Sequence, residues 1–514
     1  MNTSSTFPPL GGDNTLTLAD RSRCGGEIVF FRPAGAVQSC RWLMHGVILA
    51  AFILVFMLVE APSLALGPAW VFAATAVYLL GAAVLAAATT RISLRGLSRS
   101  ASPLPATIRV HNVLFLLTQG WLVGGLAAII LLGYGRWVWQ DISLGGLPLV
   151  GKATVLGPFI AALMLTWLLD YPFYRAVRRH IAQQQAQAGI LVRPGWRLGE
   201  YLAYNVRHHL LFVAVPIGLI ALAIDVLQLY VHPRLPEAIA DYLITGGTVA
   251  AAAAVFVTAP LLIARIWKTA PLEPGPLRQR LEEICRRLKL RYRDILIWRS
   301  GGMIANAGVM GVAGRFRYVL LSDVLIEHME QQHIESIFAH EAGHIVSRHI
   351  PYSVLFAVAT VAICGMAGDF LAARLNAPYW AGQMLAVAML AAAWAGGFGW
   401  LSRRFERQSD VIAAWALAGQ APQGGEDKRI TPEGAATFAQ ALQRVAQLNG
   451  IPARQHNWRH GSISRRISYV LWLGSKGGTR QEIDRTVRGI KIGLWIALAA
   501  AGAIAAVQIV LSLG

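Results

Sequence analysis

The chain has 514 residues, of which 55% are hydrophobic and only 14% are charged. Soluble domains carry about 25% charged residues, so this composition excludes an ordinary soluble protein. The formal net charge of +19 would suggest nucleic acid in a soluble chain, but in a membrane protein basic residues gather on cytoplasmic loops. We therefore expect a lipid bilayer and no nucleic acid among the partners. The four cysteines (24, 40, 285 and 364) are scattered and form no C-x-x-C pair, so we expect ordinary reduced thiols and not a disulfide or zinc-ribbon framework.

Apolar segments follow a polar N-terminal tail that is rich in Gly, Pro, Ser and Thr. Nine of them approach or reach the length that a helix needs to cross a bilayer. The predicted spans are 43–59, 64–89, 113–134, 153–169, 210–229, 243–264, 352–371, 379–401 and 492–513. Because the first begins only near Leu43 and a second follows, we interpret it as a retained span and not a cleaved signal peptide.

Basic residues in the short loops predict the orientation of these spans. With a cytoplasmic N-terminus, the inside segments carry fourteen arginines. The outside loops then hold four basic residues, Arg136, Lys152, Arg234 and Arg374. Cytoplasmic loops are enriched in Lys and Arg, so the N-terminus is expected inside. The polar regions 265–351 and 402–491 then both face the cytoplasm and meet there, although a membrane hairpin divides them in sequence.

The first polar region has the pattern of a small α+β unit. Apolar residues recur at helical spacing from Leu277 to Leu288, which predicts an amphipathic helix. Residues 292–298 and 318–321 are expected to be strands, with the Gly-rich segment 301–314 between them. A further helix is expected to begin at Ser322 or Asp323.

An H-E-x-x-H pattern follows at His340, Glu341 and His344. Positions four apart lie on one face of a helix, so both imidazoles can bind one metal ion while Glu341 stands beside an open coordination position. This arrangement suits zinc-assisted hydrolysis of an amide, with Glu341 as the base that takes a proton from water and later passes it to the leaving amine. The motif alone remains a hypothesis, so a third ligand is needed.

No histidine directly after the motif is expected to supply the third ligand. The metzincin pattern needs Gly three residues and His six residues after His344, where Ser347 and Ile350 stand instead. On a continuous helix His349 would lie about 140° around from His344, which predicts a surface or interfacial histidine.

Two acidic residues four apart follow the membrane hairpin, in an E-x-x-x-D pattern. Glu406 and Asp410 share a helical face, and the hairpin returns the chain to the side of His340. Glu406 could complete a His₂Glu metal site, while Asp410 could hydrogen-bond a liganding imidazole from behind.

H-E-x-x-H, a membrane hairpin and E-x-x-x-D together resemble the HtpX-type and CAAX-prenyl-protease-type integral membrane zinc metalloendopeptidases. The resemblance runs from about residue 275 to 470. It implies one Zn²⁺ per chain and a zincin-like α+β domain.

Two further segments are similar to patterns of this family. Asn306, Ala307, Gly308 and Val309 resemble its substrate-binding edge strand, although Gly308 replaces what is often a larger residue. Without the resemblance to this family, the segment would be interpreted equally well as a Gly-rich hairpin that binds no ligand. The segment from His460 to Ile467 resembles a His-Pro-x-x-x-x-Arg-Ile pattern with Gly461 in place of proline, which implies that His460 or Arg466 donates to the oxyanion. Alternatively, Arg465 and Arg466 bind lipid phosphates or cap a helix.

The sequence thus predicts a mostly α, polytopic membrane protein with about nine spans and a cytoplasmic metalloprotease domain. The expected parts are a tail (1–42), a membrane domain of about six spans (43–264), two protease halves (265–351 and 402–491), the hairpin between them (352–401) and a final span (492–514). The predicted function is zinc-dependent endoproteolysis of membrane or membrane-associated polypeptides. The HtpX-type resemblance implies protein quality control at a bacterial inner membrane, whereas the CAAX-prenyl-protease-type resemblance would imply prenyl-protein processing. An intramembrane zinc protease, and a non-catalytic scaffold or transporter that retains a relic motif, are the alternatives. The oligomeric state stays open.

Overall fold

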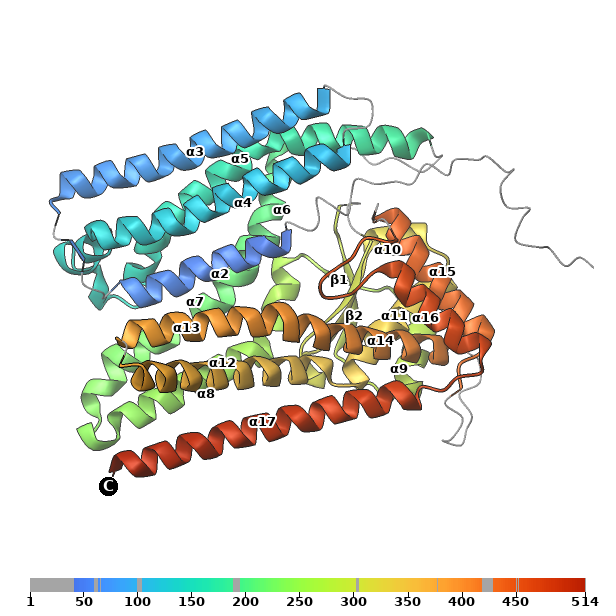
Figure 1. The fold of residues 1–514 in the computed structure, drawn as a ribbon. Helices are drawn as coiled ribbons and strands as arrows, with labels where there is room; N and C mark the ends of the chain where they lie inside the picture. The colour runs from blue at the N-terminus through green and yellow to red at the C-terminus, as the bar shows by residue number, and fades with distance from the viewer. Residues whose placement is uncertain are drawn as a thin grey trace, which may run out of the picture.

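The fold is mostly α-helical and is that of a polytopic membrane protein (Figure 1). The computed structural model describes residues 41–59, 63–64, 66–98, 104–187, 195–301, 305–376, 378–417, 429–449, 451 and 453–513, so nearly all of the predicted tail lies outside them. Eight described helices are long and apolar enough to cross a membrane, and Met44–Leu58 is a shorter apolar helix. Together they account for all nine predicted spans. The mostly α, membrane-spanning fold class is confirmed.

Six of these helices form the N-terminal bundle. They are α2 (Arg41–Leu58), α3 (Pro68–Ser98), α4 (Leu104–Ile129, continuing to Tyr134), α5 (Val150–Gln187), a long helix that contains α6 (Leu198–Asn205) and α7 (Phe212–Val226), and α8 (Glu237–Ile266). Small residues allow α3 and α4 to pack closely, since a Cβ at Gly125 would lie 2.4 Å from the Tyr78 ring. At one end of the bundle Lys152 forms an ion pair with Asp225, which ties α5 to α7.

A four-stranded sheet follows the bundle. Its strands are β1 (Ala270–Pro271), β2 (Asp294–Trp298), β3 (Ala307–Met310) and β4 (Tyr318–Ser322), in the order β1-β2-β4-β3. β2 and β4 are parallel, whereas β3 pairs antiparallel with β4 and forms an edge of the described sheet. The two predicted strands are thus present, and β3 forms from the Gly-rich segment between them. β1 was not among the strands predicted from the sequence.

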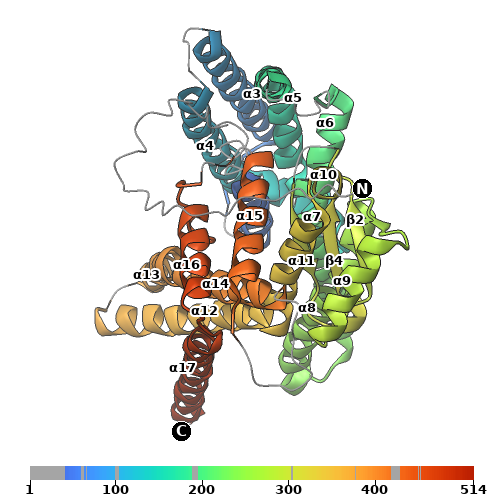
Figure 2. The same cartoon turned by 90° about the vertical axis from the view of Figure 1, so that its right-hand side faces the viewer.

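Helices from both polar regions pack around one hydrophobic core beside this sheet. The first region contributes α9 (Pro276–Arg287), α10 (Asp323–His328) and α11 (Gln331–Val346). The second contributes α14 (Gly399–Ala416), α15 (Pro432–Leu448) and α16 (Ile463–Ser475). Their shared core includes the fully buried side chains of Leu281, Phe338, Val411 and Phe438. Figure 2 views the molecule from the end where these helices lie.

A membrane hairpin connects the two regions. It consists of α12 (His349–Arg374) and α13 (Tyr379–Ala392), and the returning helix runs on without interruption from Ala381 to Ala416. The last helix, α17 (Gln481–Leu513), packs against α12 and α14. One helix therefore leaves the hairpin and carries the second acidic pattern into the core of the α+β unit.

The backbone breaks between α11 and α12. Arg348 adopts the left-handed conformation with φ 55°, so the chain turns sharply before His349 begins a new helix. His349 is buried with 2% exposure. The prediction of a surface or interfacial histidine is therefore wrong, because it assumed a continuous helix across Arg348.

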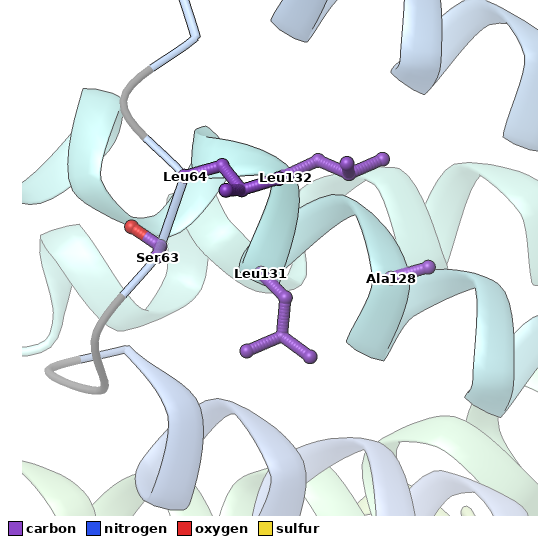
Figure 3. Close-up of a pocket in the computed structure, with 5 residues that line it drawn as sticks. All are labelled: Ser63, Leu64, Ala128, Leu131 and Leu132. Atoms are coloured by element: carbon purple, nitrogen blue, oxygen red, sulfur yellow. The ribbon is translucent and has the colours of Figure 1, made fainter.

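An apolar hollow of about 540 Å³ lies in the N-terminal bundle (Figure 3). Ser63, Leu64, Ala128, Leu131 and Leu132 line it. Among these described lining residues only one side chain is polar and none can be ionised, so they offer no group suited to acid–base or metal chemistry. It lies at the opposite end of the helix array from α11 and α14 (Figure 1).

Candidate metal centre

Three side chains from two helices converge beside the core. His340 and His344 extend from one face of α11, and Glu406 extends from α14. The Nε2 atoms of the two histidines lie 3.3 Å apart. Glu406 Oε2 lies 3.6 Å from His340 Nε2, and Glu406 Oε1 lies 3.6 Å from His344 Nε2. The structure thus brings together the three residues that the sequence suggested as metal ligands.

The spacing of these atoms fits a tetrahedral metal ion. Protein ligands bind Zn²⁺ at about 2.0–2.2 Å, which places tetrahedral ligand atoms about 3.3–3.6 Å apart. The three separations fall in this range, with the Glu406 carboxylate presenting one oxygen to each histidine. Two imidazoles and a carboxylate are also one of the ligand sets of catalytic zinc sites, which leave the fourth position open. The residues therefore fit one Zn²⁺, with His340, His344 and Glu406 as its ligands.

Close packing of α11 against α14 makes this convergence possible. A Cβ at Gly343 would lie only 3.1 Å from the Cα atom of Ser409, so a larger residue would separate the helices. Ser409 itself is fully buried. Gly343, the second variable position of the H-E-x-x-H motif, therefore has a structural reason to be glycine.

A buried charge network lies behind the three donors. Asp410 Oδ1 lies 2.9 Å from His340 Nδ1, on the side of the ring away from His344. Arg466 donates from Nε and Nη2 to the two carboxylate oxygens of Asp410 at 2.9 and 2.6 Å, and its Nη1 lies 3.2 Å from Glu406 Oε2. Asp410 thus favours a proton on His340 Nδ1, which leaves Nε2 bare for a metal.

The ionisable groups of α11 respond differently to these surroundings. Burial lowers the pKa of His344 to about 3, so this imidazole is neutral, as a metal ligand must be. Burial also acts to lower the pKa of His340, but the contact with Asp410 outweighs it and the pKa is raised. Burial raises the pKa of Glu341 to about 7, against the opposing effect of His340.

The residues suggested for the oxyanion occupy different positions. His460 is 39% exposed, and its Nδ1 lies 2.8 Å from Glu406 Oε1, so it borders the candidate metal centre. Arg466 is largely buried, and its contacts are with Asp410 and Glu406, not with the surface where lipid phosphates could bind. Arg465, its neighbour, is exposed. These contacts favour a positioning role for Arg466 and leave His460 closer to where a substrate could lie.

The segment suggested for substrate binding lies next to the motif helix. Ala307, Gly308 and Val309 belong to the edge strand β3, which contacts α11, and Asn306 precedes it. The side chain of Asn449, at the end of α15, accepts from the N–H of Ala305 at 3.1 Å and donates to its carbonyl at 2.6 Å. A Cβ at Gly308 would meet nothing within 4 Å.

Sequence reasoning missed three buried residues near the centre. His349 contacts His344, Gln408 contacts His349, and Asn449 fixes the chain before β3. The only signal for His349 was Pro351, because proline is tolerated in the first turn of a helix and so marks a new helix start. Gln408 and Asn449 carried no signal, since an isolated amide fits many surface positions.

Comparisons with known proteins agree with the motif analysis. Residues 271–451 match the family described as peptidase family M48. No curated protein matches the chain. The chain is similar to the crystal structure of S. mikatae Ste24p, with 14% identity and a TM-score of 0.42 over 80% of this chain and 100% of that chain. The matched segment contains all three candidate ligands, Glu341 and Asp410, so its similarity to family M48 agrees with the resemblance inferred from the motifs.

Proposed function

We propose that this protein is a zinc-dependent metalloendopeptidase with His340, His344 and Glu406 as ligands and Glu341 as general base. Glu341 lies on α11, the helix that also carries both histidines. The observation that carries the proposal is the convergence of α11 and α14, which places the two histidine Nε2 atoms 3.3 Å apart and one oxygen of Glu406 3.6 Å from each of them. That spacing supports one Zn²⁺ per chain.

Each residue has a role in the proposed reaction. A bound Zn²⁺ would polarise the scissile carbonyl and make water more acidic. The Glu341 carboxylate would accept a proton from the attacking water and deliver it to the nitrogen of the leaving amine. A general base works best when its pKa lies near the working pH, and the pKa of Glu341 is raised to about 7 by burial. His460 would face the carbonyl oxygen of the substrate, while Arg466 would hold Asp410 and Glu406 in place.

We further propose membrane or membrane-associated polypeptides as substrates, cleaved at the cytoplasmic membrane surface. The centre lies where the hairpin helix Ala381–Ala416 passes from its apolar part into the α+β core, which supports a site next to the bilayer. An extended polypeptide could pair with the edge strand β3 through backbone hydrogen bonds. The positive-inside bias supports the cytoplasmic side. The HtpX-type resemblance supports protein quality control at a bacterial inner membrane.

Two alternatives make different predictions. An intramembrane protease would carry H-E-x-x-H on a membrane span, but α11 is not among the helices of the described residues that could cross a membrane. A scaffold or transporter with a relic motif would need neither zinc nor Glu341 for its function.

The decisive test replaces Glu341 by Gln in the full-length protein purified in detergent. We expect one zinc per chain by metal analysis, as in the wild type, and loss of cleavage of a fluorescently labelled unfolded protein. Glu335→Gln is the matched control, because Glu335 lies on the same helix and its carboxylate contacts only Gln331 among the contacts seen. Unchanged cleavage by Glu341→Gln would remove the proposed base, and a wild type without zinc would favour the scaffold.

A further inference from the structure

A row of hydrogen-bonded side chains runs from the candidate ligand His344 to the last helix of the protein. His344 Nδ1 lies 2.9 Å from His349 Nδ1, and His349 Nε2 lies 2.8 Å from Gln408 Oε1. Gln408 Nε2 donates to Asp484 Oδ1 at 2.6 Å. His349 and Gln408 are buried, with 2% and 5% exposure. Asp484 belongs to the first turn of α17 and lies outside the segment 271–451.

The direction of every hydrogen bond in this row follows from its last member. An ionised carboxylate only accepts, and Arg480 Nε donates to the other oxygen of Asp484 at 3.0 Å, which favours the ionised form. Gln408 must therefore turn its NH₂ group to Asp484 and its carbonyl oxygen to His349. That oxygen accepts from His349 Nε2–H, so a neutral His349 has a bare Nδ1. The bare Nδ1 in turn accepts from His344 Nδ1–H.

The row thereby sets the tautomer of the candidate ligand. With its proton on Nδ1, a neutral His344 presents a bare Nε2, the atom that lies 3.3 Å from His340 Nε2 and 3.6 Å from Glu406. Stacking of the His349 ring on Phe405, with centroids 4.1 Å apart and planes 6° apart, fixes the orientation of the middle member. Asp410 favours a proton on Nδ1 of His340 and so leaves Nε2 of that ring bare as well. Each imidazole is therefore oriented by a carboxylate, His340 by Asp410 directly and His344 by Asp484 through the row.

We infer that His349, Gln408 and Asp484 are positioning residues that hold His344 in the metal-binding tautomer, and that α17 thereby contributes to the metal centre. The inference rests on the proposed function, because it takes His344 as a zinc ligand. Partners behind metal-liganding histidines change metal affinity by about 10- to 100-fold when they are removed. The same range is expected here.

The test compares variants that keep or reverse the direction of the hydrogen bonds in the row. Gln408→Lys retains a partner for Asp484 but directs a donor at His349 Nε2. His349 must then carry its proton on Nδ1, which moves the proton of His344 to Nε2 and blocks the metal. We expect zinc affinity, measured by chelator competition on the full-length protein, to fall at least about tenfold. Gln383→Lys is the matched control, because Gln383 donates to Asp369 at 3.0 Å on the hairpin, in a pair without contact to the metal centre.

A double substitution, Gln408→Glu with Asp484→Asn, exchanges amide and carboxylate and preserves the acceptor that faces His349. We expect its zinc affinity within about threefold of the wild type, and the absorption spectrum of its Co²⁺ form to match that of wild-type Co²⁺ protein. If Gln408 and Asp484 only stabilised the packing, the two substitutions of the double variant would lower zinc affinity at least as much as the single Gln408→Lys substitution. The inference is overturned if the double variant binds zinc as weakly as Gln408→Lys, or if Gln408→Lys binds it as tightly as the control.

Failure of the inference is distinguishable from failure of the proposed function. If wild-type protein binds one zinc and Glu341→Gln abolishes cleavage, but the polarity of the row has no effect on affinity, only the positioning role is lost. If the wild type binds no zinc, both the proposed function and the positioning role are contradicted. If Gln408→Lys does not fold, the double variant is compared with the wild type directly, and a zinc affinity at least about tenfold below that of the wild type overturns the inference.

Discussion

Gly343 on α11 and Ser409 on α14 lie so close that a Cβ on the glycine would come within 3.1 Å of the serine Cα. This contact joins the two polar regions of the chain directly beside the candidate ligands. His344 follows Gly343 in sequence, and Glu406 lies one turn before Ser409. The distance between the two helices therefore sets the distance between the imidazoles and the carboxylate.

Gly343→Val should separate α11 from α14 and weaken zinc binding. Overpacking a well-packed contact costs about 1–3 kcal/mol, which corresponds to roughly a 5- to 150-fold loss if it falls on the bound state. Chelator competition would measure the affinity. Gly365→Val on α12 is the control, because a Cβ at Gly365 meets nothing within 4 Å. Equal affinities for the two variants would show that the helix spacing does not limit the site.

Arg466→Gln should destabilise the metal-free protein more than the zinc-loaded protein. Removing the guanidinium leaves Asp410 and Glu406 as buried carboxylates without their cation, a change that typically costs about 3–5 kcal/mol. A bound Zn²⁺ would supply positive charge and reduce that cost. Thermal unfolding with and without chelator would measure the difference. Arg465→Gln is the control, since Arg465 is exposed. The same loss with and without zinc would contradict the expected coupling.

Gly308→Val should impair cleavage without affecting zinc. A Cβ at this position meets nothing within 4 Å, so the strand accepts a side chain, but the new methyl groups would crowd a polypeptide paired with β3. We expect a raised KM for the labelled unfolded protein, with zinc content and unfolding temperature as in the wild type. A KM equal to that of the wild type would argue against substrate binding along β3.

Cys285 should resist alkylation in the folded protein. Burial, with a smaller contribution from Glu282, raises the pKa of this thiol to about 12. Because the raised pKa favours the neutral thiol, this group stabilises the fold fully below the unfolded pKa of about 8.5, and the contribution is lost as the pH rises from about 8.5 toward 12. Iodoacetamide at pH 8, followed by peptide mass spectrometry, should modify Cys285 only after denaturation. Rapid modification of the native protein would contradict its burial.

The sequence by itself determined the features that depend on local spacing. Nine apolar segments predicted the membrane helices, because the length of an apolar helix decides whether it can cross a bilayer. His340 and His344 were predicted to share a face because 3.6 residues complete a turn of helix. Glu406 and Asp410 followed from the same rule, and the hairpin that returns the chain placed them on the correct side.

Only the tertiary structure decided how these local patterns meet. The left-handed conformation of Arg348 turns His349 back toward His344, and helical periodicity cannot foresee a break in the helix. Gln408 and Asp484 are 76 residues apart, and their contact depends on α17 packing against α14. Periodicity reports which face of a helix is apolar, but the partner of that face is chosen by the packing of the whole chain. The orientation of the candidate ligands is therefore a property of the folded protein and not of either motif.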